Sequence, residues 1–197
     1  MNALKSSLAA ASMALALATP AMAHIFETQD APSQGEIGRA ITEMATELAE
    51  RQADEERVAR NLETFRQLDL EVFSNAELDR FDESHHPDVV VYMPDGRVVY
   101  GLEDHLVDVG WFFIWAPDTH VERHIARFGQ GEWTAAIGVL KGTFTADMPL
   151  ADGSILEANG NSYEINFTTV ARWEEGLMVE EYLFWDNDYF FSQLTAE

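Results

Sequence analysis

The sequence contains no cysteine, only two lysines (Lys5 and Lys141), and no long uninterrupted hydrophobic run. The lack of cysteine excludes disulfide bonds, thiolate catalysis and lipid attachment to a cysteine. No stretch approaches the roughly 20 apolar residues that a membrane-spanning helix needs. The 197 residues contain no internal repeat and no low-complexity tract, and this length is typical of one domain with appendages.

Basic residues are scarce in comparison with acidic ones. The chain has 12 lysines and arginines against 35 aspartates and glutamates, which gives a formal net charge of −23. Such a surface repels phosphate backbones and anionic lipids, so we expect no nucleic acid and no membrane among the partners. The charge favours solubility and carries little information about a reaction.

Residues 1–23 have the pattern of a secretory signal peptide. Lys5 is the positive start, residues 8–18 form the apolar core, and Ala21, Met22 and Ala23 form the small-residue cleavage site. We therefore expect a periplasmic or secreted protein. Cleavage would leave His24 at the amino terminus, but we expect no copper there because residues 24–35 read as a linker.

The spacing of apolar residues predicts helices in the first third of the chain. They recur at helical intervals in two sets: Ile37, Ile41, Met44 and Leu48, then Val58, Leu62, Phe65, Leu68 and Val72. The charged stretch 50–57 between the sets fits either two helices or one long helix. We expect 24–56 to be a linker and an amphipathic helix that packs on a neighbouring element or on a second subunit, and 57–197 to be the folded domain. We also expect a homodimer.

Strands dominate the rest of the chain. We expect a hairpin at 89–100, a helix at 103–116 that ends before Pro117, and long strands at 119–128, 132–145, 163–173 and 177–186. The loop at 147–161 contains Pro149, Gly153 and Gly160 and could gate a site. This order predicts an α+β fold with helices packed on one side of a curved, mostly antiparallel sheet.

The final strand contains the candidate site. Its residues Glu180, Tyr182, Phe184 and Asp186 alternate, so they share one face. A carboxylate between aromatic rings is poorly solvated, and this raises its pKa toward the range that a general acid or base needs. We expect this face to line a pocket, with Asp186 as the proton-transfer group. The alternative is an exposed face whose acids lie in water.

The end of the chain resembles that of the SnoaL-like polyketide cyclases. The shared pattern is Gly176, an apolar residue, a glutamate, an aromatic residue, Asp186 and a closing Gln193 and Leu194. The resemblance runs from about residue 57 to residue 194 and includes Pro87, Asp88, Gly101, Gly142 and Thr143. These proteins belong to the nuclear-transport-factor-2-like superfamily, in which a strongly bent sheet packed against helices has the shape of a cone.

The resemblance implies a pocket on the concave face, no cofactor, and an aspartate that acts as acid and base in an intramolecular aldol closure. That aspartate corresponds to Asp186, with Glu180 and Tyr182 beside it. We add Phe184, Tyr92, Trp111 and Trp115 as substrate-binding candidates. Many relatives have histidine where this chain has Phe144, and also near Tyr92 or Met93, so a different reaction stays open.

Six histidines remain to be placed. His120, Glu122 and His124 alternate along one strand, and two imidazoles with a carboxylate suit zinc or iron. The next strand has no obvious ligand, and Arg123 and Arg127 indicate a charge-paired surface, so we predict no metal. We expect His85 and His86 in a loop or cap, and His105 at the surface.

We therefore expect a protein that binds a small apolar carbonyl compound in a conical pocket. It would move protons with Asp186 in a reaction of the cyclase or isomerase type. The alternatives are a non-catalytic protein that binds a hydrophobic small molecule, and an assembly module that docks through the helix at 36–50.

Overall fold

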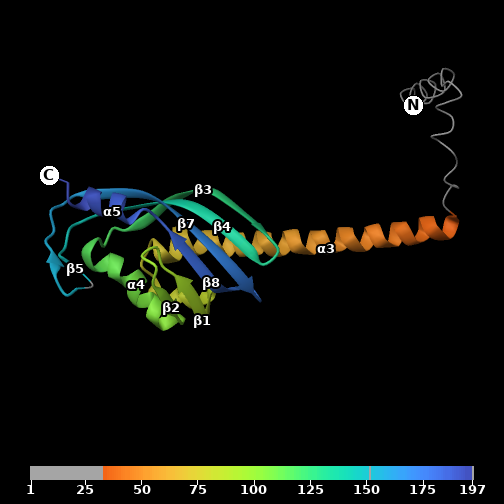
Figure 1. Cartoon of the computed structure of the whole chain (residues 1–197), viewed down its shortest axis with the longest axis horizontal. Helices are drawn as coiled ribbons and strands as arrows, with labels where there is room; N and C mark the ends of the chain where they lie inside the picture. Colours follow the sequence, from red (N-terminus) through yellow and green to blue (C-terminus); the bar gives the residue numbers. More distant parts are fainter. Residues whose placement is uncertain (1–32, 151, 197) are drawn as a thin grey trace, which may run out of the picture. The chain divides into compact units, whose positions relative to one another are not determined.

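The computed structural model describes residues 33–150 and 152–196 (Figure 1). The predicted signal peptide at 1–23 and His24 lie outside the described residues. The chain divides into two units, Met1–Leu48 and Ala49–Glu197, and the second contains the whole sheet. Within the described ranges, no helix is both long and apolar enough to cross a membrane.

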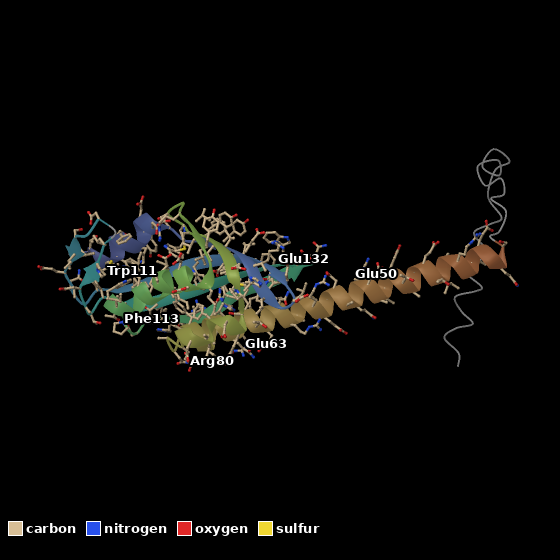
Figure 2. The ribbon with its side chains drawn as sticks, turned by 90° about the horizontal axis from the view of Figure 1, so that it is seen from below. Glu50, Glu63, Arg80, Trp111, Phe113 and Glu132 are labelled. Atoms are coloured by element: carbon tan, nitrogen blue, oxygen red, sulfur yellow. The ribbon has the colours of Figure 1, made fainter. Side chains whose placement is uncertain are left out.

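Helix α3 is a single α-helix that spans Gln34–Gln67, so of the two alternatives the long helix is correct. A capping box starts it: the Ser33 N–H donates to the Glu36 carboxylate at 2.7 Å, and the Glu36 N–H donates to Ser33 Oγ at 3.3 Å. In the second unit, Val58 and Phe65 turn to the buried side, while Figure 2 shows Glu50 and Glu63 among the side chains that project along the helix.

The helix continues directly into a π-helical turn, η3 (Leu68–Phe73), and a 3₁₀ helix, η4 (Leu78–Glu83), follows. A π-helix inserts one extra residue into a turn and thereby changes which side chains face inward; such turns are frequent at functional sites. Here the inward side chains are Leu68, Asp69 and Val72. The turn therefore places a carboxylate among apolar core residues.

Six strands form one sheet in the order β2-β1-β8-β7-β4-β3. Their bounds are His85–Tyr92 (β1), Val98–Tyr100 (β2), His120–Gln130 (β3), Trp133–Thr143 (β4), Ser162–Glu174 (β7) and Leu177–Phe184 (β8), and a separate short hairpin pairs Met148–Pro149 (β5) with Ile155–Leu156 (β6). Only the β1–β8 pair of this sheet is parallel. The expected α+β fold with a mostly antiparallel sheet is confirmed.

Helices α4 (Leu102–Trp115) and α5 (Asn187–Leu194) complete the second unit (Figure 1). Strand β7 alternates between buried and exposed positions along its length, as its sequence predicts. Its buried Tyr163 packs against Trp115 of α4 and Phe190 of α5, with ring centroids 5.5 and 5.0 Å apart. This aromatic cluster joins both helices to the sheet.

Gly138 in β4 lies directly under the ring of Phe167, so we expect Gly138→Ala to be destabilising. A Cβ there would meet the Cε1 and Cζ atoms of Phe167 far inside van der Waals distance. Overpacking of this kind lowers the free energy of unfolding by about 1–3 kcal/mol, measurable by urea denaturation. Gly110→Ala is the matched control, because its Cβ would lie 3.5 Å from Leu78 Cδ1 within helix α4 and should add about 0.5–1 kcal/mol. Equal effects of the two changes would contradict this packing.

The first unit presents an apolar row on α3, and the expected homodimer stays a prediction that this row can test. Ile37, Ile41, Met44 and Leu48 are between 45% and 68% exposed. Replacing Ile41 and Met44 with glutamate should reduce the mass in solution to that of one chain, measured by light scattering. An unchanged number of subunits would reject this row as the contact.

Candidate functional site

A pocket with a cavity volume of about 80 Å³, partly open to solvent, lies in the second unit between the sheet and the helical segments η3, η4 and α4. Its wall is mostly apolar and includes Leu68, Phe73, Phe112, Leu140, Phe167 and Leu183. The acidic and histidine side chains on the wall are Asp69, His85, His105, Asp108 and Glu181. A concave apolar surface with few polar groups is the usual form of a small-molecule site.

The first polar group of the wall, which we call the His–Glu cluster, consists of His85, His105 and Glu181. They come from β1, α4 and β8, and all three are buried. Glu181 Oε2 lies 3.3 Å from His105 Nε2 and 3.7 Å from His85 Nε2. The expectation of a loop position for His85 and a surface position for His105 was therefore wrong, because parallel pairing of β1 with β8 draws His85 inward.

The surroundings set the protonation states in this cluster. Burial alone raises the pKa of Glu181, but the attraction of His85 and His105 outweighs it, and the net pKa is below its usual value. Burial lowers the pKa of His105, although the charge of Glu181 opposes the shift. At neutral pH the cluster therefore has an ionised carboxylate beside a neutral His105 imidazole.

The second polar group, the Asp–His pair, consists of Asp69 and His124. Asp69 Oδ2 lies 2.7 Å from His124 Nε2, and both side chains are almost fully buried. Burial raises the pKa of Asp69, and the hydrogen bond and charge of His124 offset this only in part. A carboxyl with a raised pKa on an apolar wall is the kind of group that proton transfer near neutral pH requires.

Strand β3 turns His124 inward through two register shifts, one on each side of Arg123 and His124. These bulges break the alternation that would place His120, Glu122 and His124 on one face. Glu122 instead pairs with Lys141 at 2.6 Å, and His120 Nδ1 lies 2.8 Å from the Asp118 carbonyl oxygen. The three side chains do not converge.

The model of the SnoaL-like polyketide cyclase family matches residues 63–194. This chain belongs to the SnoaL-like polyketide cyclase family. Its fold is similar to that of a protein from Jannaschia sp. CCS1 named as a SnoaL-like polyketide cyclase, with 18% identity, a TM-score of 0.62, and coverage of 71% of this chain and 94% of that one. IdmH from Streptomyces antibioticus is 21% identical, with a TM-score of 0.57 and coverage of 68% and 97%. The search of curated proteins found no match.

Within this SnoaL-like fold, β8 turns the opposite face inward from the one that we expected. Glu181 and Leu183 line the pocket, so Glu180, Tyr182 and Phe184 point to the other side. There Glu180 forms an ion pair with Arg172 at 2.7 Å and accepts a hydrogen bond from the Tyr182 hydroxyl at 3.0 Å. The prediction that this face of β8 lines the pocket was therefore wrong, because Glu180 pairs with the Arg172 guanidinium outside the pocket.

The other expected site residues also lie away from the pocket lining. Asp186 is exposed and caps α5, where its carboxylate accepts the Tyr189 N–H at 2.9 Å. Tyr92 stacks on Tyr182 at 4.3 Å, the Trp111 indole donates to the Pro149 carbonyl at 2.8 Å, and Trp115 is fully buried in the core. Trp111 and Phe113, both labelled in Figure 2, belong to α4. A usable sequence signal was Glu181, a lone acid on the otherwise apolar face of β8.

Asp69 should give the protein an unusual pH dependence of stability. Because the pKa of Asp69 is raised in the folded state, its contribution to stability is fully present below the unfolded-state pKa of about 3.9 and is lost as pH rises through the folded-state value. Urea unfolding at several pH values should therefore show Asp69→Asn gaining stability relative to the wild type as pH rises.

Glu122→Gln is the control with the opposite sign. The hydrogen bond from Lys141 lowers the pKa of Glu122, so its contribution appears above the unfolded-state pKa and is lost as pH falls. That variant should lose stability relative to the wild type as pH rises, by a small amount because the pair is exposed. Slopes of the same sign in both variants would contradict the burial of an Asp69 carboxyl.

Proposed function

We propose that this protein binds a small apolar carbonyl compound in the pocket and catalyses proton transfer at the carbon next to the carbonyl, with Asp69 as acid and base. The observation that carries the proposal is a buried carboxyl with a raised pKa on the wall of an otherwise apolar pocket. General acid–base catalysis needs a group whose pKa approaches the working pH, and burial provides it here.

The Asp–His pair supports this role through its geometry. His124 holds Asp69 Oδ2 at 2.7 Å, so Oδ1 is the oxygen that would meet a ligand. A hydrogen bond to one carboxylate oxygen fixes the side chain in one orientation and limits the loss of entropy on reaction. His124 is thus a positioning residue, while Asp69 would touch the substrate.

In the proposed reaction Asp69 acts first as a base and then as an acid. The ionised Asp69 takes a proton from the carbon, and the electron pair of the broken C–H bond moves to the carbonyl oxygen and forms an enolate. Where that carbon also adjoins a C=C bond, the electron pair spreads over a dienolate, and the protonated Asp69 returns the proton to the far carbon of that bond, which is isomerisation. In a cyclase-type reaction, the enolate carbon bonds to a second carbonyl carbon, and the new alkoxide takes the proton instead.

The His–Glu cluster would provide the polar end of the pocket, where a carbonyl oxygen can be held. The imidazole of His105 would donate a hydrogen bond to that oxygen, and apolar side chains such as Phe112 and Phe167 line the same pocket. In a water-poor site, each polar contact to a developing negative charge has a larger effect than in solution.

Two further expectations stay proposals. We infer from the signal-peptide pattern at 1–23 that the protein works in the periplasm or outside the cell. The alternative of a binding protein without catalysis uses the same pocket, and the alternative catalytic residue is Asp186. The variants Asp69→Asn and Asp186→Asn distinguish catalysis by Asp69 from catalysis by Asp186 and from binding without catalysis.

Asp69→Asn should lower turnover by at least about 100-fold while binding persists, because the amide keeps the shape of the side chain but cannot carry the proton. The assay is deuterium incorporation next to the carbonyl of 1-indanone and 2-tetralone, followed by proton NMR, with binding measured by calorimetry. Asp186→Asn is the matched control and should retain turnover. Loss only in Asp186→Asn would return the role to Asp186, and wild-type binding without exchange would favour the binding protein.

A further inference from the structure

Three potential metal ligands meet at one wall of the pocket. His85 Nε2, His105 Nε2 and Glu181 Oε2 come from three separate elements, and a set of ligand atoms from these three residues lies within 4.8 Å of one another. Their distances to Glu181 Oε2 are 3.3 and 3.7 Å. Ligand atoms on a tetrahedral zinc, with bonds of about 2.0–2.1 Å, lie about 3.3–3.4 Å apart. The cluster therefore has nearly the spacing of a metal site before any ion is added.

Two of the three ligand atoms are buried without ordinary hydrogen-bond partners. Among the described residues, neither His85 Nε2 nor Glu181 Oε2 has one, and the ion pairs of Glu181 are with the two histidines alone. A buried carboxylate is stable only when a positive group compensates it. Either a shared proton or a metal ion would compensate this one.

The surroundings of His85 favour the metal. The carbonyl oxygen of Phe81 can only accept, so its 3.2 Å contact with His85 Nδ1 places the ring proton on Nδ1. Ser84 Oγ lies 2.9 Å from the same nitrogen. The lone pair of Nε2 is then directed toward Glu181, and metal-binding histidines are held in the same way by an N–H bond to a carbonyl. The ring of His105 is oriented by packing instead, at 6.4 Å from that of Phe81.

We propose that the His–Glu cluster binds one divalent transition-metal ion, of the zinc or iron(II) class, through His85 Nε2, His105 Nε2 and Glu181 Oε2. Two imidazoles and one carboxylate form a ligand set of catalytic zinc and non-haem iron sites, in which further coordination positions are left open. All three residues line the pocket, so an open position would face a bound ligand.

This inference goes beyond the proposed proton transfer, which Asp69 can perform without a metal. It also departs from the absence of a cofactor that the sequence resemblance implies. An ion at the His–Glu cluster would act as a Lewis acid on a carbonyl oxygen, whereas Asp69 belongs to the other polar group of the pocket. Binding of the ion and turnover are separate measurements, so the two proposals can fail independently.

The test uses the untagged protein, stripped with a chelator and titrated with Co²⁺. We expect one Co²⁺ per chain, visible absorption bands of a four- or five-coordinate ion, and displacement by Zn²⁺. Glu181→Gln and His85→Gln should each weaken binding at least about 100-fold, because loss of a direct ligand exceeds the 10- to 100-fold effect of an outer partner. Circular dichroism and thermal unfolding report whether each variant is folded.

His120→Gln and His24→Gln are the controls, since neither residue belongs to the cluster and both should leave Co²⁺ affinity unchanged. If the cluster variants do not fold, proton NMR of the Co²⁺-loaded wild type decides, with paramagnetically shifted imidazole signals expected from two histidines. Absence of saturable binding, shifted signals from another number of histidines, or unchanged affinity in the folded cluster variants would overturn the proposal. The Asp69→Asn turnover assay is run with and without chelator, so that the effect of the substitution on turnover is distinguished from the effect of the metal ion.

Discussion

The burial of Glu181 is the constraint on which the rest of the site depends. A carboxylate inside an apolar wall needs compensation, and two histidines from distant parts of the chain lie 3.3 and 3.7 Å from it, where a shared proton or a bound cation would provide that compensation. For both histidines to reach Glu181, β1 must pair with β8, and α4 must bring His105 next to that strand. The polar centre thus specifies the positions of three elements that hydrophobic packing alone would fix less uniquely.

The pocket combines two polar groups with different electrostatic character. In the His–Glu cluster the histidines keep the carboxylate ionised, whereas in the Asp–His pair burial dominates and raises the pKa of the carboxyl. Both carboxyl groups meet the same apolar space. Environments that shift two acids in opposite directions are characteristic of sites that must hold one charge and move one proton.

Much of the fold could be predicted from the sequence, because periodicity records which side of an element is buried. The alternation of β7 and the helical spacing of Val58, Phe65, Leu68 and Val72 both predicted burial that the structure has. On β8 the same reasoning was insufficient, since both of its faces contain an acid and large apolar residues. What decides between them is Arg172, which offers Glu180 a partner outside the pocket. That choice depends on strand pairing, which no local pattern contains.

The polar residues that sequence reasoning missed lie where regular geometry is interrupted. His124 faces inward because β3 is bulged around it, and Asp69 faces inward because η3 is a π-helical turn. Irregularities of this kind arise from tertiary packing and leave little trace in a single sequence. His85 and His105 sit near the starts of their elements, where periodicity has too few neighbours to assign a side.

The central position of β8 in the sheet has a consequence for the folding of the nascent chain. Of the strands that the structure describes, β8 is the last in sequence, yet it inserts between β1 and β7 and has neighbours on both edges. A nascent chain that ends before it holds two imidazoles with no acid between them and a gap in the middle of its sheet. The pocket wall that contains Glu181 and Leu183 is therefore complete only after β8 has joined the sheet.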